Sequence, residues 1–143
     1  MFKKCMIAVL IAILAGCNKD NNNVSEKPDP TLQLLTQKEW ILSATGFDDD
    51  KNGLLDAHEN TILPCQSDNS YSFHVAGTGV IEDNALVCGT PVDGNFNWQF
   101  VQDKTMIKID DQEIEIFSLN ENELILSPDI PGLAVKFMLK YRH

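Results

Sequence analysis

From residue 40 onward, hydrophobic and polar positions alternate with a period close to two, which is the pattern of half-buried β-strands. The stretch 70–75, for example, places Tyr71, Phe73 and Val75 on one face. Stretches of this kind are separated by short polar segments, which is typical of strands joined by turns. The alternation predicts eight strands, over residues 40–45, 70–75, 78–83, 96–101, 105–110, 113–119, 123–127 and 134–141.

The connections between these strands indicate how the sheet is arranged. The turns at 102–104, 110–112 and 120–122 are short and polar, which favours hairpins between neighbouring strands. Residues 31–38 predict one or two helical turns, too short a helix for a parallel crossover. Because a closed sheet has no exposed edges, we predict an all-β fold, an eight-stranded antiparallel up-and-down barrel with a short N-terminal helix. A β-sandwich is the alternative.

The first 16 residues have the pattern of a bacterial signal peptide. Lys3 and Lys4 precede the apolar run from Met6 to Leu14, which is too short to span a bilayer as a helix. The run ends in "LAGC", and its small residues before Cys17 resemble the lipobox of bacterial lipoproteins. This resemblance implies cleavage before Cys17 and acylation of that cysteine, which would anchor the protein to a membrane. An ordinary signal peptide is the alternative.

The rest of the chain divides into a linker and one domain. Residues 17–30 are polar, contain prolines and lack periodicity, which predicts a flexible linker. Residues 31–143 have the length of a single domain with one core. The residue after Cys17 is Asn18 rather than aspartate, and by resemblance to lipoprotein sorting rules this favours the outer membrane of the cell envelope.

Charge and cysteine content restrict the partners and the compartment. The formal charge is −10, so the chain would be repelled by phosphate backbones, and no nucleic-acid partner is expected. Of the four cysteines, Cys5 would leave with the signal peptide and Cys17 would be acylated. The remaining pair, Cys65 and Cys88, predicts a disulfide in an oxidising compartment, with free thiols as the alternative.

Residues 48–59, "DDDKNGLLDAHE", match the spacing of an EF-hand calcium loop. Such a loop needs oxygen ligands at positions 1, 3, 5, 7, 9 and 12 and a glycine at position 6, because a hard cation takes six to eight oxygens. The spacing therefore predicts a Ca²⁺ site with Gly53 at the bend and Leu55 packed inward. Its ligands are Asp48, Asp50, Asn52, Leu54 (through its carbonyl), Asp56 and Glu59.

The flanks of this loop differ from those of an EF-hand. The preceding residues predict a strand, and Pro64 and Cys65 prevent a long second helix. We therefore expect a lone, structural calcium loop inserted in a β-fold, with a dissociation constant of roughly 10⁻⁴ to 10⁻³ M. The alternative is a hydrated Asp- and Asn-rich connection that holds no ion.

Four segments together resemble a known family: "LLTQKEWIL", "PCQSDNSYSFH", "CGTPVDGNFNWQF" and "KFMLKY". They look like the lipocalin-like domains of small Gram-negative outer-membrane lipoproteins, and the resemblance covers about residues 34–141. It implies a barrel whose interior could carry a small hydrophobic ligand. The aromatic residues that would line such a cavity, or else fill the core, are Trp40, Phe73, Trp98 and Phe137.

No arrangement of residues predicts catalysis. His58, His74 and His143 lie far apart in the sequence, and the chain has no nucleophile motif of the GxSxG type. We therefore predict a non-catalytic protein with a structural or interaction role, docking another envelope protein or, alternatively, carrying a small hydrophobic ligand.

Overall fold

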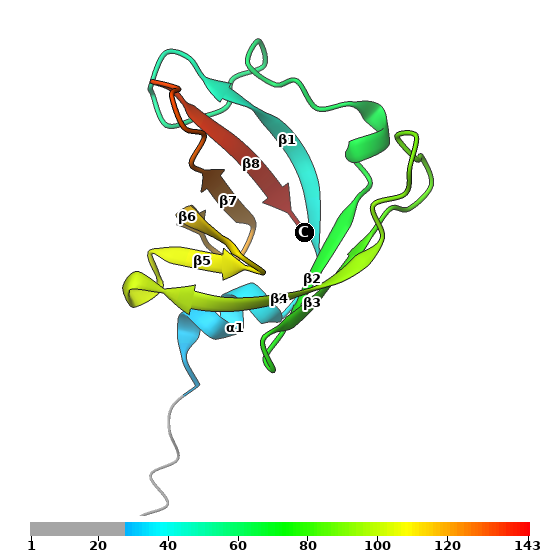
Figure 1. Ribbon diagram of the computed structural model, residues 1–143, viewed down its shortest axis with the longest axis vertical. Helices are drawn as coiled ribbons and strands as arrows, with labels where there is room; N and C mark the ends of the chain where they lie inside the picture. Colours follow the sequence, from blue (N-terminus) through cyan, green and yellow to red (C-terminus); the bar gives the residue numbers. More distant parts are fainter. Residues whose placement is uncertain (1–27) are drawn as a thin grey trace, which may run out of the picture.

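The protein was analysed as a computed structural model that describes residues 28–143. The predicted signal peptide, the acylation site Cys17 and residues 18–27 of the predicted linker lie outside the described residues. Over the part that is described, no helix is long and apolar enough to cross a membrane. The elements, drawn in Figure 1, are α1 (Pro30–Thr36), β1 (Trp40–Asp48), the 3₁₀ turn η1 (Pro64–Gln66), β2 (Ser70–His74), β3 (Thr78–Glu82), β4 (Gly94–Val101), the 3₁₀ turn η2 (Gln102–Lys104), β5 (Met106–Ile109), β6 (Gln112–Leu119), β7 (Glu123–Pro128) and β8 (Lys136–Arg142).

The eight strands form an up-and-down antiparallel sheet that closes on itself. Each strand pairs with the next one in the chain, and β8 pairs with β1 to close the barrel. The closing seam runs from the pair Ile41–Arg142 to the pair Asp48–Lys136. The predicted eight-stranded barrel is therefore confirmed, and the β-sandwich alternative is excluded.

Each strand differs from its predicted bounds by one to three residues at one end or both, and two of these differences have a clear physical cause. β1 continues to Asp48 rather than stopping at Thr45, because β8 supplies hydrogen-bonding partners along its whole length. β2 ends at His74, and Val75, expected on a buried face, is 70% exposed, so that expectation was wrong. The cause is the tight turn to β3, where the Gly77 N–H donates to the His74 carbonyl at 2.9 Å.

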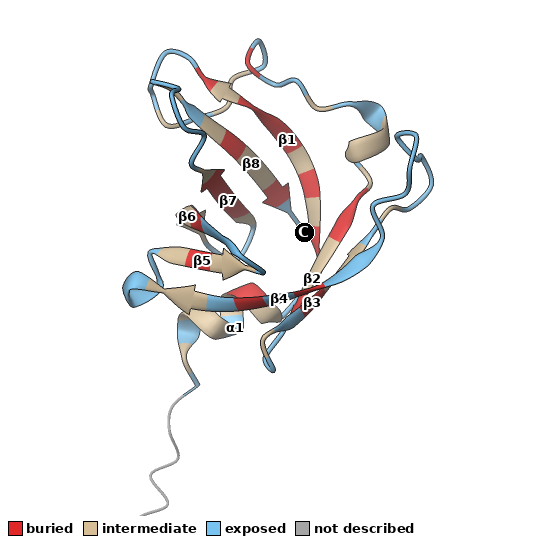
Figure 2. Ribbon diagram, viewed as in Figure 1, coloured by how far each residue is buried: buried red, intermediate tan, exposed pale blue. Residues whose placement is uncertain are grey.

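The interior of the barrel is filled with apolar side chains. Figure 2 shows buried residues recurring along β1, β7 and β8. The ring of Phe73 packs edge-on against those of Phe96 and Trp98, with centroids 5.2 and 5.6 Å apart, a favourable aromatic geometry. The buried core comprises Leu35, Trp40, Leu42, Phe73, Phe96, Trp98, Ile107, Ile114, Leu124, Leu126 and Tyr141.

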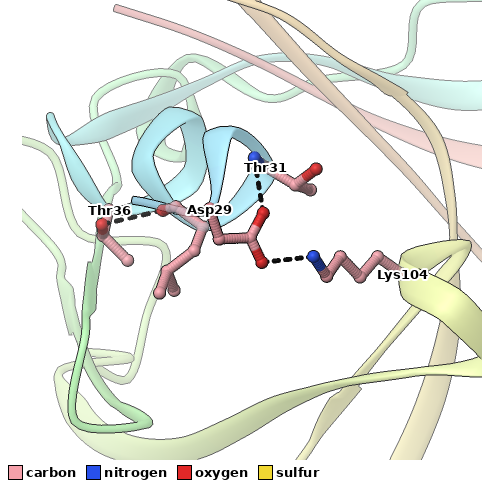
Figure 3. A network of polar contacts seen from close by, with 5 residues as sticks. Asp29, Thr31, Thr36 and Lys104 are labelled. Carbon is pink, nitrogen blue, oxygen red and sulfur yellow. Dashed lines mark hydrogen bonds and ion pairs between the residues drawn. The ribbon is translucent and has the colours of Figure 1, made fainter. Parts of the chain in front are cut away.

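Helix α1 lies across one end of the barrel (Figure 1). Asp29 caps it by accepting a hydrogen bond from the Thr31 N–H at 3.0 Å, and the Asp29 carboxylate forms an ion pair with Lys104 of η2 (Figure 3). Inside the barrel end, Leu35 is fully buried and its carbonyl accepts the Trp40 indole N–H at 3.0 Å. The ion pair of Asp29 and the indole of Trp40 therefore connect both ends of α1 to the barrel.

The predicted disulfide is present. Cys65 in η1 is bonded to Cys88 in the β3–β4 connection, with Cα atoms 5.3 Å apart. The bond joins two connections that lie at the end of the barrel away from α1 (Figure 1). Closing a loop of this length contributes on the order of 3 kcal/mol by restricting the unfolded chain.

Candidate metal site

The acidic loop of residues 48–59 follows β1 at the end of the barrel opposite α1 (Figure 1). Its first residue, Asp48, is the last of β1 and faces Lys136 across the closing seam. Its far end returns to the same strand, where Asn60 forms an isolated bridge with Gly46 and the Thr61 N–H donates to the Thr45 carbonyl at 2.7 Å. Strand β1 therefore holds both ends of the loop.

The end of the loop can lie close against β1 because Gly46 has no side chain. A Cβ at this position would lie 1.9 Å from the Glu59 carbonyl oxygen, so no other residue fits without a shift of the backbone. This contact places Glu59, the twelfth residue of the loop, beside the first. A glycine inside a strand can signal such a close backbone approach, and sequence reasoning did not use it here.

Three of the predicted ligands converge. Carboxylate oxygens of Asp48, Asp50 and Glu59 all lie within 4.8 Å of one another. Asp48 and Glu59 are each only 4% exposed, whereas Asp50 is exposed. Oxygen ligands on opposite sides of a calcium ion are about 5 Å apart, so this set fits one ion without a large rearrangement.

Backbone N–H groups hold the two buried carboxylates in place. The Oδ1 and Oδ2 atoms of Asp48 accept the N–H groups of Asn52 and Gly53, both at 3.0 Å. Gly53 has a φ of +81°, the left-handed conformation in which the chain can bend back around the carboxylate. The chain therefore bends at Gly53, the position at which the spacing places the bend.

Glu59 is fixed in the same way. Its Oε2 accepts the Asp56 N–H at 2.9 Å, and its Oε1 accepts the Asp49 N–H at 2.7 Å. The Asp56 N–H has the largest effect and lowers the pKa of Glu59 below its usual value; burial opposes this, and the N–H groups of Asp49 and Asp50 add to it. Oε1 also accepts the Asp50 N–H at 3.4 Å, whereas Oε2 has a single hydrogen bond and keeps a lone pair that could bind a cation.

The other predicted ligands surround this group. The Asn52 amide donates to Asp50 at 3.0 Å and to Asp56 at 3.4 Å, which links positions 3, 5 and 9 of the loop. The side chain of Leu54 is 57% exposed, and the role predicted for this residue involves only its carbonyl. Side chains at positions 3, 5 and 9 are therefore joined by hydrogen bonds, while those at positions 1 and 12 are held by backbone N–H groups of the same loop.

The loop packs on the outer surface of the barrel. Leu139 and Tyr141 belong to the core, so Met138, which directly precedes Leu139, points outward, yet it is fully buried. Its partner across the seam is Gly46, where an added Cβ would also lie 3.4 Å from the Leu55 side chain. The predicted inward packing of Leu55 thus takes place on the outer face of β1 and not in the barrel core.

A second outer contact comes from β6. An added Cβ at Gly53 would lie 3.0 Å from the tip of the Phe117 ring, and the Lys136 ammonium group lies 5.0 Å from the centre of that ring. Lys136 also pairs with Glu115 at 2.6 Å. The sequence did not indicate Phe117 as part of the site. Its contact with the loop forms only because β6 pairs with β7 and β7 pairs with β8.

The four aromatic residues considered for a ligand cavity lie in two places. Trp40, Phe73 and Trp98 belong to the buried core, where they fill the barrel interior. Phe137 packs against Phe47 near the loop end of β8, with ring centroids 5.0 Å apart. The structure therefore brings only three of the four together.

Comparisons with known proteins were made for the whole chain. No family model matches it, and no curated protein matches it either. The resemblance to lipocalin-like lipoproteins accordingly rests on the residues quoted above, and the acidic loop is the feature from which a function can be inferred.

Proposed function

We propose that the protein is a lipid-anchored lipoprotein of the cell envelope whose lipocalin-like barrel binds calcium through residues 48–59. In this proposal it has a non-catalytic, structural or interaction role. The observation that carries the proposal is the convergence of Asp48 and Glu59, both buried, with Asp50. The three ion pairs formed within residues 28–143 do not involve any of these carboxylates.

Buried carboxylates without a cationic partner are costly, because they lose hydration and repel one another. A divalent cation would offset both effects at once. Ca²⁺ is favoured over Mg²⁺ because the ligands are carboxylate, amide and carbonyl oxygens on a flexible loop, whereas Mg²⁺ requires a smaller and more regular shell.

The ion would act as a brace for the end of the barrel away from α1. The connection from β1 to η1 is long, and Cys65 lies only six residues after Glu59. Calcium at one part of this connection and the disulfide at another would together restrict it. At a calcium concentration ten times the dissociation constant, binding would add about 1.4 kcal/mol to the free energy of unfolding.

The proposed anchor gives the site an orientation. The stretch from Cys17 to Pro28 can span at most about 40 Å, and the described chain enters the barrel through α1. With Cys17 acylated at the outer membrane, the α1 end would be near the bilayer and the acidic loop would point away from it. The loop would then meet other envelope proteins rather than lipid.

Carriage of a small hydrophobic ligand has less support. The packed rings of Phe73, Phe96 and Trp98 occupy the interior in which such a ligand would lie. We therefore propose that this protein acts through the surface formed by the acidic loop, and not through its interior.

Calorimetric titration of Ca²⁺ into residues 24–143, with the disulfide formed, tests the proposal. We expect one ion per chain, and loss of the binding heat in Asp48→Asn and in Glu59→Gln. Glu121→Gln removes the same charge from an exposed turn and should leave binding unchanged. Absence of binding heat at millimolar calcium would contradict the proposal. It would favour the alternative, a hydrated acidic connection that holds no ion.

A further inference from the structure

A groove of about 600 Å³ lies on the outer face of the barrel, over β5, β6 and β7. Its floor contains three neighbouring side chains, since Met106 pairs with Glu115 and Glu115 pairs with Ser127. Each of the three is next in sequence to a residue of the core and therefore points away from the barrel interior. Ser127 is only 6% exposed, so a hydroxyl group lies at the bottom of the groove.

A tight turn supplies one wall of the groove. The Leu133 N–H donates to the Ile130 carbonyl at 3.2 Å, and Gly132 has a φ of +88°. Proline followed by glycine, here Pro131 and Gly132, is typical of the middle of such a turn, which brings its two end residues close together. The end residues, Ile130 and Leu133, both line the groove and are 37% and 49% exposed. The wall is therefore an apolar surface that a ligand can cover.

A second wall is formed by η2, whose backbone is strained. Gln102, Asp103 and Lys104 have φ values of +49°, +54° and +67°, a left-handed conformation that is unfavourable for residues other than glycine. The Thr105 hydroxyl holds this turn by donating to the Gln102 carbonyl at 2.7 Å, and the ion pair of Lys104 with Asp29 holds it from the other side (Figure 3). Gln102 and Thr105 line the groove. Strained residues of this kind cluster at ligand-binding sites.

Two carboxylates of the groove lie opposite each other. Ile114 pairs with Pro128, so the next position along each chain places Glu113 opposite Asp129, and both line the groove. Like charges directly opposite each other are unfavourable. The three ion pairs formed within residues 28–143 do not involve either carboxylate. Lys108 pairs with Glu113 from β5 but does not line the groove.

The lysine that lines the groove is already engaged. Lys136 pairs with Glu115 at 2.6 Å and lies 5.0 Å from the centre of the Phe117 ring. Three carboxylates and this one ammonium group give the groove a formal charge of −2. The groove therefore attracts a cation and repels an anion.

We propose that this groove binds a small amphipathic amine, a molecule with one ammonium group and an apolar body. The ammonium group donates to Glu113 and Asp129 and relieves their repulsion, while the apolar body lies on Met106, Ile130 and Leu133. A metal ion would leave the apolar wall uncovered, and a neutral apolar molecule would leave the carboxylates unpaired. The site lies outside the barrel interior and shares no residue with the calcium loop, so it does not depend on the function proposed for that loop.

Titration calorimetry of the full chain in phosphatidylcholine nanodiscs, with empty nanodiscs as the blank and about 0.15 M salt, tests the proposal. The probes are three indoles that differ in charge, namely tryptamine (a cation), tryptophol (neutral) and indole-3-propionate (an anion). We expect one tryptamine per chain, bound about fivefold more tightly than tryptophol, and no binding of indole-3-propionate. Equal binding of tryptamine and tryptophol, or no binding of tryptamine at millimolar concentration, would overturn the proposal.

Variants with matched controls locate the site. Asp129→Asn should weaken tryptamine binding about three- to fivefold, and Leu133→Ala should weaken it by a similar factor because an apolar contact is lost. Glu121→Gln removes the same charge from an exposed turn, and Leu86→Ala shortens a leucine that is 53% exposed in the β3–β4 connection, so both should leave binding unchanged. Losses as large in these controls would show general attraction to an acidic surface and overturn the proposal. Unfolding midpoints of all variants check that the barrel remains folded.

Discussion

The carbonyl oxygen of Glu59 lies 1.9 Å from the position that a Cβ on Gly46 would occupy. The last of the predicted ligands therefore lies against the strand that carries the first. This contact fixes the span between Asp48 and Glu59, so the geometry of the proposed calcium site depends on a residue that binds no ion.

Gly46→Ala should push the returning segment away from β1. We expect a loss of about 1–3 kcal/mol in the free energy of unfolding, because the added methyl has no space, together with weaker calcium binding. Chemical denaturation and calcium titration measure the two effects. Gly94→Ala is the matched control, since a Cβ at Gly94 meets no atom within 4 Å, and equal losses in both variants would contradict the steric argument.

Removal of calcium should lower the thermal unfolding midpoint. At ten times the dissociation constant the ion adds about 1.4 kcal/mol, which for a domain of this size is a shift of roughly 5 °C. Differential scanning calorimetry with calcium and with excess chelator measures the shift. Glu59→Gln should show none, and a shift of the same size in that variant would place the ion elsewhere.

Stability should decrease in acid through Glu59. Its pKa is lowered from the usual value of 4.5 by the Asp56 N–H and its neighbours. The stabilisation is therefore fully present above about pH 4.5 and is lost as the pH falls through the lower pKa of the folded state. Denaturation between pH 6 and pH 3 should show a shallower decline for Glu59→Gln than for the unmodified protein. Asp29, whose pKa is lowered by its ion pair with Lys104, contributes in the same direction, so Asp29→Asn provides a comparison.

Loss of the disulfide should cost on the order of 3 kcal/mol. The double variant Cys65→Ala, Cys88→Ala frees η1 from the β3–β4 connection, and urea denaturation measures the change. Faster hydrogen exchange at the Ala85 and Leu86 amides, which donate to Asp68, should accompany it. An unchanged unfolding midpoint would mean that hydrogen bonds alone hold these connections.

The strands were predictable because their signal is local. Alternation at Tyr71 and Phe73, or at Phe96 and Trp98, follows from the period of two in any strand with one buried face. The stop of β2 at His74 was missed because Val75 continues the apolar alternation while Gly77 bends the backbone. The extension of β1 to Asp48 depends on β8, which lies some 90 residues later, and no local pattern reports such a pairing.

The candidate metal site was likewise predictable from the sequence only in part. The ligand spacing from Asp48 to Glu59 could be recognised, because a chain that wraps an ion must present oxygens at set intervals. The contacts that support the loop could not, since Gly46, Met138 and Phe117 come from three strands and meet only on the outside of the closed barrel. Their residue types are ordinary for strands and carry no sign of a site.

The seam between β1 and β8 has a consequence for the order in which the protein is made. Asp48 pairs with Lys136 of β8, which is synthesised some 90 residues later. Until that final strand arrives, β1 lacks its partner and the acidic loop has no fixed start, so the ion has nothing rigid to bind. Closure of such distant strands is slow compared with hairpin formation. Calcium is therefore expected to act on the finished barrel and to have no part in guiding the growing chain.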